Sequence, residues 1–172
     1  NIAERWNISR QDQDAFAMRS HFLAIEAQDK GLYDDEIVPV VIPRRKGDPV
    51  VVSRDEMPRR DTSMETLSGL KAAFRKGGSV TAGNSSALND GASMMILASE
   101  KGLANQPQLR SRVIGRVLHS GAVGVDPRIM GIGPVGAIRL ACERSGVAVS
   151  ELGLVEINEA FAAVAIANQR EL

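Results

Sequence analysis

The spacing of apolar positions predicts a first long helix near the start of the chain. Apolar and small residues recur on one face at Phe16, Ser20, Leu23 and Ala27. Ser9-Arg10-Gln11-Asp12 has the capping-box pattern that begins a helix, and Gly31 suits its end. The opposite face is crowded with charge, which is typical of a solvated surface.

A similar pattern predicts three further helices. In the first, Thr62-Ser63-Met64-Glu65 has capping-box spacing before an apolar stripe of Leu67, Leu70 and Phe74, and Gly77-Gly78 ends it. The next should carry Met94, Met95, Leu97 and Ala98 after the polar loop 83–91. The third should start near Pro134 and run to Gly146.

Strand patterns alternate with these helices, so we expect an α/β protein. The predicted strands are 36–42, with Pro39 at an edge or bulge, a short one at 79–82, and 112–125 with glycine breaks. Residues 43–62 are polar and rich in Pro and Gly, which predicts a long functional or mobile connection.

The chain is organised around a last strand and helix. Leu154 to Ile157 is a short β-branched run, and Ala-rich sequence from Glu159 onward predicts a helix directly after it. Asn158 then lies at the carboxyl end of a strand, where open α/β sheets bind ligands. The alternative is that Asn158 is only the N-cap of the helix.

Composition narrows the classes of function. The 172 residues are 44% hydrophobic and 24% charged with zero net charge, which argues against nucleic acid as the main partner. No apolar run approaches the roughly 20 residues that span a bilayer, so we expect no membrane partner. The single cysteine, Cys142, excludes an intramolecular disulfide and fits a reducing compartment. The chain starts without Met and stops within a predicted helix, so we expect an internal piece of a longer protein.

Few residues indicate a catalytic or ligand-binding role without further context. Gly83-Asn84-Ser85-Ser86-Ala87 lacks the last glycine of the G-x-S-x-G nucleophile elbow, so a loop that caps a helix is favoured over a serine hydrolase using Ser85 or Ser86. Such exposed amides and hydroxyls also suit an anionic or amide-rich ligand. Cys142 lies mid-helix and is interpreted as structural, and His21 and His119 are isolated. No metal-ligand cluster is present.

Several short segments together resemble the thiolase family in order and spacing. They are 81–86 (TAGNSS), 89–91 (NDG), 124–127 (GVDP), 130–134 (MGIGP) and 158–162 (NEAFA). The resemblance implies a thiolase-like layered α/β fold, present in part as the loop domain and parts of both core halves. Residues 1–85 would form the loop domain, 86–110 the end of the first half, and 111–172 the start of the second.

The resemblance also assigns site residues. Asn158 matches the asparagine that holds a water in the oxyanion hole, where a donor stabilises the thioester oxygen as it becomes an enolate, an interaction worth roughly 3–4 kcal/mol. The other matched positions contact coenzyme A or line the acyl pocket. Ala82 and Ser86 match the stretch beside the pantetheine amides, and Arg59 matches an arginine near the nucleotide. Thr66 replaces a serine, and the pocket walls match Met130, Ala160 and Phe161.

The resemblance implies an acyl-CoA C-acyltransferase that uses coenzyme A and acyl-CoA as substrates, with no prosthetic group and no metal. It also implies a cytoplasmic homodimer or homotetramer. The family's nucleophilic cysteine, its Gly-His-Pro histidine and its acid/base cysteine have no match among these residues, so we expect the chain alone to be inactive. The rival interpretation is a non-catalytic thiolase-like subunit that binds acyl-CoA or lipid.

Overall fold

The computed structural model describes residues 1–172, which divide into two compact units. The first unit comprises Asn1–Ser86 with Asn158–Gln169, and the second comprises Ala87–Ile157 with Arg170–Leu172.

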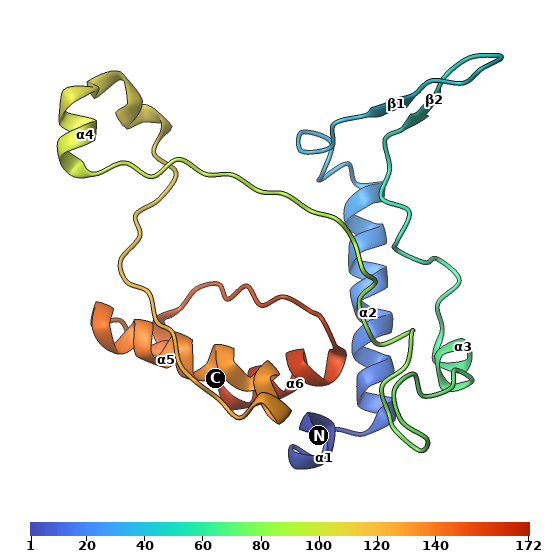
Figure 1. The fold of residues 1–172 in the computed structure, drawn as a ribbon. Coiled ribbons are helices and arrows are strands. Elements are labelled where there is room, and N and C mark those ends of the chain that lie inside the picture. The colour runs from blue at the N-terminus through green and yellow to red at the C-terminus, as the bar shows by residue number, and fades with distance from the viewer. The chain divides into compact units, whose positions relative to one another are not determined.

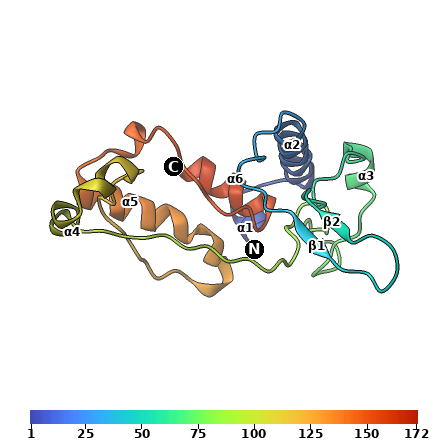
Figure 2. The same ribbon diagram turned by 90° about the horizontal axis from the view of Figure 1, so that it is seen from above.

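The first unit is built on the long helix α2, Arg10–Asp29, which follows the short helix α1, Ile2–Arg5. Ser9 Oγ accepts from the Asp12 amide, and Asp12 Oδ2 accepts from the Ser9 amide. The predicted capping box is therefore confirmed. Just beyond the helix, Gly31 has a φ of +66°, which glycine adopts without strain. Helix α3, Met64–Ser68, lies beside α2 in both views (Figure 1, Figure 2).

Helix α3 is much shorter than the predicted helix, which extended to Gly77. Its capping box joins Ser63 to Thr66, one residue later than the expected pair. After Leu70 the chain turns to pair with itself, as the Ala73 amide donates to the Val80 carbonyl and Ala72 bridges Thr81. This pairing replaces helical hydrogen bonds, so the apolar stripe through Phe74 does not form a helix.

Residues 40–52 form a β-hairpin. Strand β1, Val40–Ile42, pairs antiparallel with β2, Val50–Val52, in the register Val41 to Val51. The prediction of a strand over 36–42 was correct only for its last residues, because Pro39 has no amide hydrogen to donate to a ladder. The prediction that 43–62 is only a connection was wrong, since its β-branched Val50–Val52 supplies the partner strand.

The second unit is built on helix α5, Gly133–Ser145, which has Pro134 in its first turn and ends at Gly146 with a φ of +73°. Both boundaries agree with the prediction. The rest comprises helix α4, Glu100–Asn105, capped by Ser99, and three 3₁₀ helices at Pro107–Arg112, Pro127–Ile132 and Val149–Glu151.

Three predicted elements of this unit are absent from the structure. Residues 87–99 form no helix, and neither 113–126 nor 152–157 forms a strand. Leu88, Ile96 and Ile114 are more than nine-tenths exposed. An apolar helix face needs a surface to pack on and a strand needs a ladder partner. Residues 1–172 offer neither to these segments.

Helix α6, Ala162–Glu171, begins later than the sequence predicted. The chain stays extended through Phe161 because residues 160–162 pair with residues 84–86. Asn158 therefore is not the N-cap of this helix, and the prediction that it joins a strand directly to a helix was wrong.

Candidate functional site

An antiparallel bridge between two distant segments forms the centre of the candidate site in the first unit. Ser85 faces Phe161 across this bridge. The Ser86 amide donates to the Ala160 carbonyl at 2.9 Å, and the Ala162 amide donates to the Asn84 carbonyl at 3.0 Å. The bridge thus brings together three of the predicted contact residues, Ser86, Ala160 and Phe161.

The two adjacent serines of this loop have different environments. Ser85 Oγ donates to the Thr81 carbonyl at 2.6 Å, so its proton is committed to holding the loop. This geometry disfavours Ser85 as the nucleophile of a serine hydrolase, which must give its proton to a base. Ser86 is exposed and its hydroxyl makes no hydrogen bond within the chain, so it is accessible to a polar ligand.

Aromatic packing and one polar contact fix the other side of the bridge. The Phe161 ring meets Phe74 edge to face, with centroids 6.0 Å apart and planes at 75°. Ser20 Oγ on α2 donates to Glu159 Oε2 at 2.9 Å, next to Asn158. Asn158 itself is exposed. Its amide can therefore meet a water or a ligand.

The loop packs closely on two leucine side chains at Gly83. A Cβ on Gly83 would lie 2.5 Å from Leu67 Cδ2 and 2.6 Å from Leu70 Cδ1. Ala82, the other predicted contact residue of this loop, is exposed.

Arg59 is held at the surface by its neighbours. Its guanidinium donates to Asp61 at 3.1 and 3.3 Å, and this hydrogen bond raises the pKa of Arg59 and lowers that of Asp61. Its backbone amide donates to His21 Nδ1 at 3.2 Å. The Arg59 side chain is 69% exposed, so its cation faces solvent, where a phosphate could reach it.

Thr66 serves the start of α3. Its Oγ1 accepts from the Ser63 amide at 2.9 Å and donates to the Ser63 carbonyl at 3.0 Å. A ligand that forms a hydrogen bond with this hydroxyl must therefore share it with the cap.

Met130 belongs to the second unit, within the 3₁₀ helix Pro127–Ile132, and is 73% exposed.

The remaining chemical groups form no further site. Cys142 is buried in α5, in agreement with the structural role predicted for it. No group of three or more His, Cys, Asp or Glu side chains in the chain could hold a metal ion. None of the helices combines the length and the hydropathy that a bilayer crossing requires.

Comparison with protein families gives two matches that together span nearly all of the chain. Residues 1–101 match the thiolase N-terminal domain, and residues 111–172 match the thiolase C-terminal domain. The chain belongs to the thiolase family. The resemblance inferred from the short segments is thereby confirmed.

Curated relatives of the chain are considerably longer. A probable acetyl-CoA acyltransferase of Staphylococcus aureus (strain COL) is 49% identical over all 172 residues, and an acetyl-CoA acetyltransferase of Pseudomonas aeruginosa is 48% identical. The chain covers 43% of each of these relatives.

Solved structures agree on the fold. The Bacillus anthracis acetyl-CoA acetyltransferase superposes with a TM-score of 0.87 at 46% identity, over 99% of this chain and 42% of that one. Human mitochondrial 3-ketoacyl-CoA thiolase gives a TM-score of 0.86 at 37% identity, over 100% of this chain and 42% of that one. The predicted fold class, a partial thiolase-like α/β fold, is therefore confirmed.

Proposed function

We propose that the whole protein is an acyl-CoA C-acyltransferase that moves an acyl group between coenzyme A and a 3-ketoacyl-CoA through a cysteine thioester. The observation that carries this proposal is the bridge between 84–86 and 160–162 in a chain of the thiolase family. It joins an exposed hydroxyl, at Ser86, to an aromatic wall, at Phe161. A pantetheine arm offers amides and an apolar chain, which suit these two surfaces.

The residues of this chain would bind and orient the substrate and would not form the covalent bond. Ser86 and Ala82 would lie along the pantetheine amides, Ala160 and Phe161 beside the acyl end, and Arg59 near the nucleotide phosphates. Thr66 and Met130 would add a hydroxyl and a pocket wall. Asn158 would hold a water that donates to the thioester oxygen as negative charge develops there.

We also propose how this chain is divided into domains and how the whole protein assembles. Residues 1–85 would form the loop domain, 86–110 the end of the first half, and 111–172 the start of the second. Acyl-CoA and CoA would be its substrates, without a prosthetic group, in a cytoplasmic homodimer or homotetramer.

The test is thiolysis of acetoacetyl-CoA by the whole protein and by its Asn158→Ala variant. A donor that acts mainly in the transition state lowers kcat more than it raises KM when it is removed. We expect kcat to fall by about 100-fold, in line with the loss of one oxyanion-hole donor. An unchanged kcat with a raised KM would make Asn158 a ground-state contact instead.

Two further assays test whether this chain is inactive alone and whether the whole protein is instead a carrier. The 172-residue chain, assayed alone with acetoacetyl-CoA and CoA, should show no turnover above its Cys142→Ser variant, because acyl transfer needs an activated thiolate. A whole protein that binds acyl-CoA without turnover would favour the non-catalytic carrier.

A further inference from the structure

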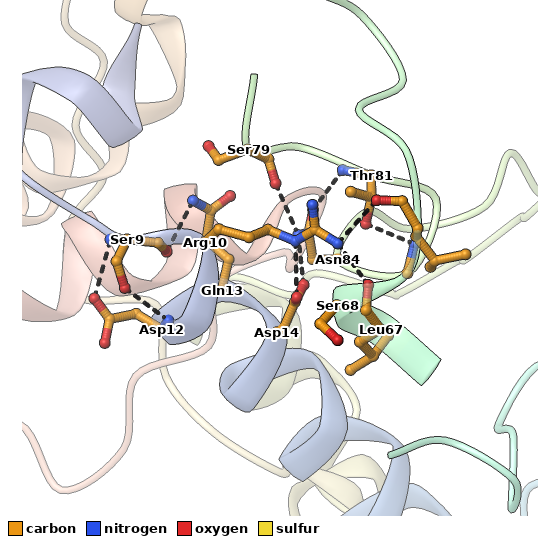
Figure 3. Close-up of polar contacts among 12 residues, drawn as sticks. Ser9, Arg10, Asp12, Gln13, Asp14, Leu67, Ser68, Ser79, Thr81 and Asn84 are labelled. Carbon is orange, nitrogen blue, oxygen red and sulfur yellow. Dashed lines mark hydrogen bonds and ion pairs between the residues drawn. The ribbon is translucent and has the colours of Figure 1, made fainter. Parts of the chain in front are cut away.

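A buried charge lies on the face of α2 that meets the 79–86 loop. Asp14 is 1% exposed and Asn84 is 3% exposed. Asn84 Nδ2 donates to Asp14 Oδ1 at 2.9 Å, and Arg10 Nε donates to Asp14 Oδ2 at 2.7 Å. Figure 3 shows dashed lines from the Asp14 carboxylate to Arg10 and to Asn84. The substrate contacts proposed above assign no role to this cluster.

A carboxylate is costly to bury unless it is paired and hydrogen-bonded. Both oxygens of Asp14 have such a partner. Arg10 in turn reaches α3 and the turn after it, because its Nη2 donates to the carbonyls of Leu67 at 2.5 Å and Leu70 at 3.1 Å. One carboxylate on α2 therefore connects two separate segments.

Asn84 carries this connection into the candidate site. Its side chain closes the loop on itself, since Oδ1 accepts from the Thr81 amide at 2.8 Å and Nδ2 donates to the Ser79 carbonyl at 3.1 Å (Figure 3). Its backbone carbonyl accepts from Ala162, one of the two hydrogen bonds of the bridge to Phe161. The residue anchored to Asp14 thus sets where the loop meets 160–162.

We propose that Asp14 is a positioning residue of the substrate site, which acts through Asn84 to fix the 81–86 loop against residues 160–162. Asp14 touches no substrate in this arrangement. It holds the amide orientation of Asn84, because a carboxylate accepts only from Nδ2 and leaves Oδ1 for Thr81. The consequence for catalysis rests on the proposed acyl-CoA site, whereas the consequence for the loop does not.

The experiment compares Asp14→Ala, Asn84→Ala and the double variant in the whole protein. Loss of a hydrogen bond to a charged group should misplace Ser86 and raise KM for acetoacetyl-CoA about tenfold or more, with a smaller change in kcat. Because Asp14 acts through Asn84, the double variant should have a KM no higher than that of Asn84→Ala. Additive effects on KM would overturn the proposal.

Ser9→Ala is the matched control, because it removes the N-cap of the same helix without touching the loop. It should lower Tm while KM stays within about twofold of the wild type. An equal rise of KM in Ser9→Ala would show that loss of helix stability alone explains the effect, and would overturn the positioning role.

Hydrogen exchange of the whole protein gives a readout independent of activity. Peptides covering 79–86 and 158–164 should exchange faster in Asp14→Ala and not in Ser9→Ala. Unchanged exchange in Asp14→Ala overturns the proposal. Faster exchange in Asp14→Ala, together with a wild type that shows no thiolysis, overturns only the proposed function. If Asp14→Ala does not fold, Asp14→Asn keeps one oxygen for Asn84, and should show a smaller change in both measurements; no change in either would overturn the proposal.

Discussion

His21 contacts Arg59 through a neutral ring nitrogen. The Arg59 amide donates to Nδ1, which can accept only while that nitrogen is unprotonated. Burial is the main cause that lowers the pKa of His21 below its ordinary value of 6.5, and the Arg59 charge adds to it, while Asp61 opposes both. The fold therefore favours the neutral imidazole beside the predicted nucleotide contact.

This arrangement predicts an acid-sensitive contribution to stability. A group whose pKa is lowered by folding contributes stability that is present above its unfolded pKa and is lost as pH falls through its folded pKa. The wild type should therefore lose stability below about pH 6.5 more steeply than His21→Asn, whose Oδ1 keeps an acceptor near the position of Nδ1. Urea unfolding of both proteins from about pH 8 to pH 5 measures the difference. Parallel pH profiles would contradict the prediction.

The extended segment before helix α5 packs directly against that helix instead of pairing with a strand. A Cβ on Gly121 would lie 2.5 Å from the Ala137 carbonyl oxygen and 3.2 Å from the Ala141 amide nitrogen. Arg144 on the same helix donates to the Ser120 carbonyl at 3.0 Å. Close backbone approach therefore holds this segment on α5, although it pairs with no strand.

Gly121→Ala should consequently destabilise the second unit, because the atoms it meets belong to a helix backbone that cannot move aside. We expect a loss of about 1–3 kcal/mol in the free energy of unfolding, typical of overpacking. Gly124→Ala is the matched control, since its Cβ would meet nothing within 4 Å, and it should change stability by no more than about 0.5 kcal/mol. Denaturant melts of the whole protein test the pair, and equal effects would contradict the close approach.

Many large apolar side chains of the chain are exposed. Leu88, Met94, Ile96 and Ile114 are each more than nine-tenths exposed, and Leu154 is 78% exposed. Each such side chain forgoes roughly 1.5–3 kcal/mol of burial energy, against a typical domain stability of about 5–15 kcal/mol.

The 172-residue chain by itself should therefore be only marginally stable in its second unit. We expect it to bind a hydrophobic dye, to self-associate, and to show fast amide exchange over 87–126 and 152–157. Dye binding, sedimentation and hydrogen exchange on the isolated chain measure these properties. A dilute monomer that melts cooperatively and protects the amides of 113–125 would contradict the prediction.

The sequence by itself determined features whose cause lies within a few residues. The start of α2 at Ser9, the end of α5 at Gly146 and the family motifs were all predictable, because caps and a positive φ are local properties. The roles of Arg59, Thr66 and Met130, like those of the other site residues, came from the resemblance to the family alone and stay predictions.

Tertiary structure decided what depends on residues far apart in the chain. The strand expected at 112–125 did not form, because a strand needs hydrogen bonds to a second strand and no segment of residues 1–172 pairs with it. Asp14 was not predicted as part of the site because its partner, Asn84, is 70 positions away. The same long-range pairing, between 84–86 and 160–162, delayed the start of α6 and left Asn158 outside the helix. Only the folded chain brings such residues together, since no local pattern records which buried donor will face a buried carboxylate.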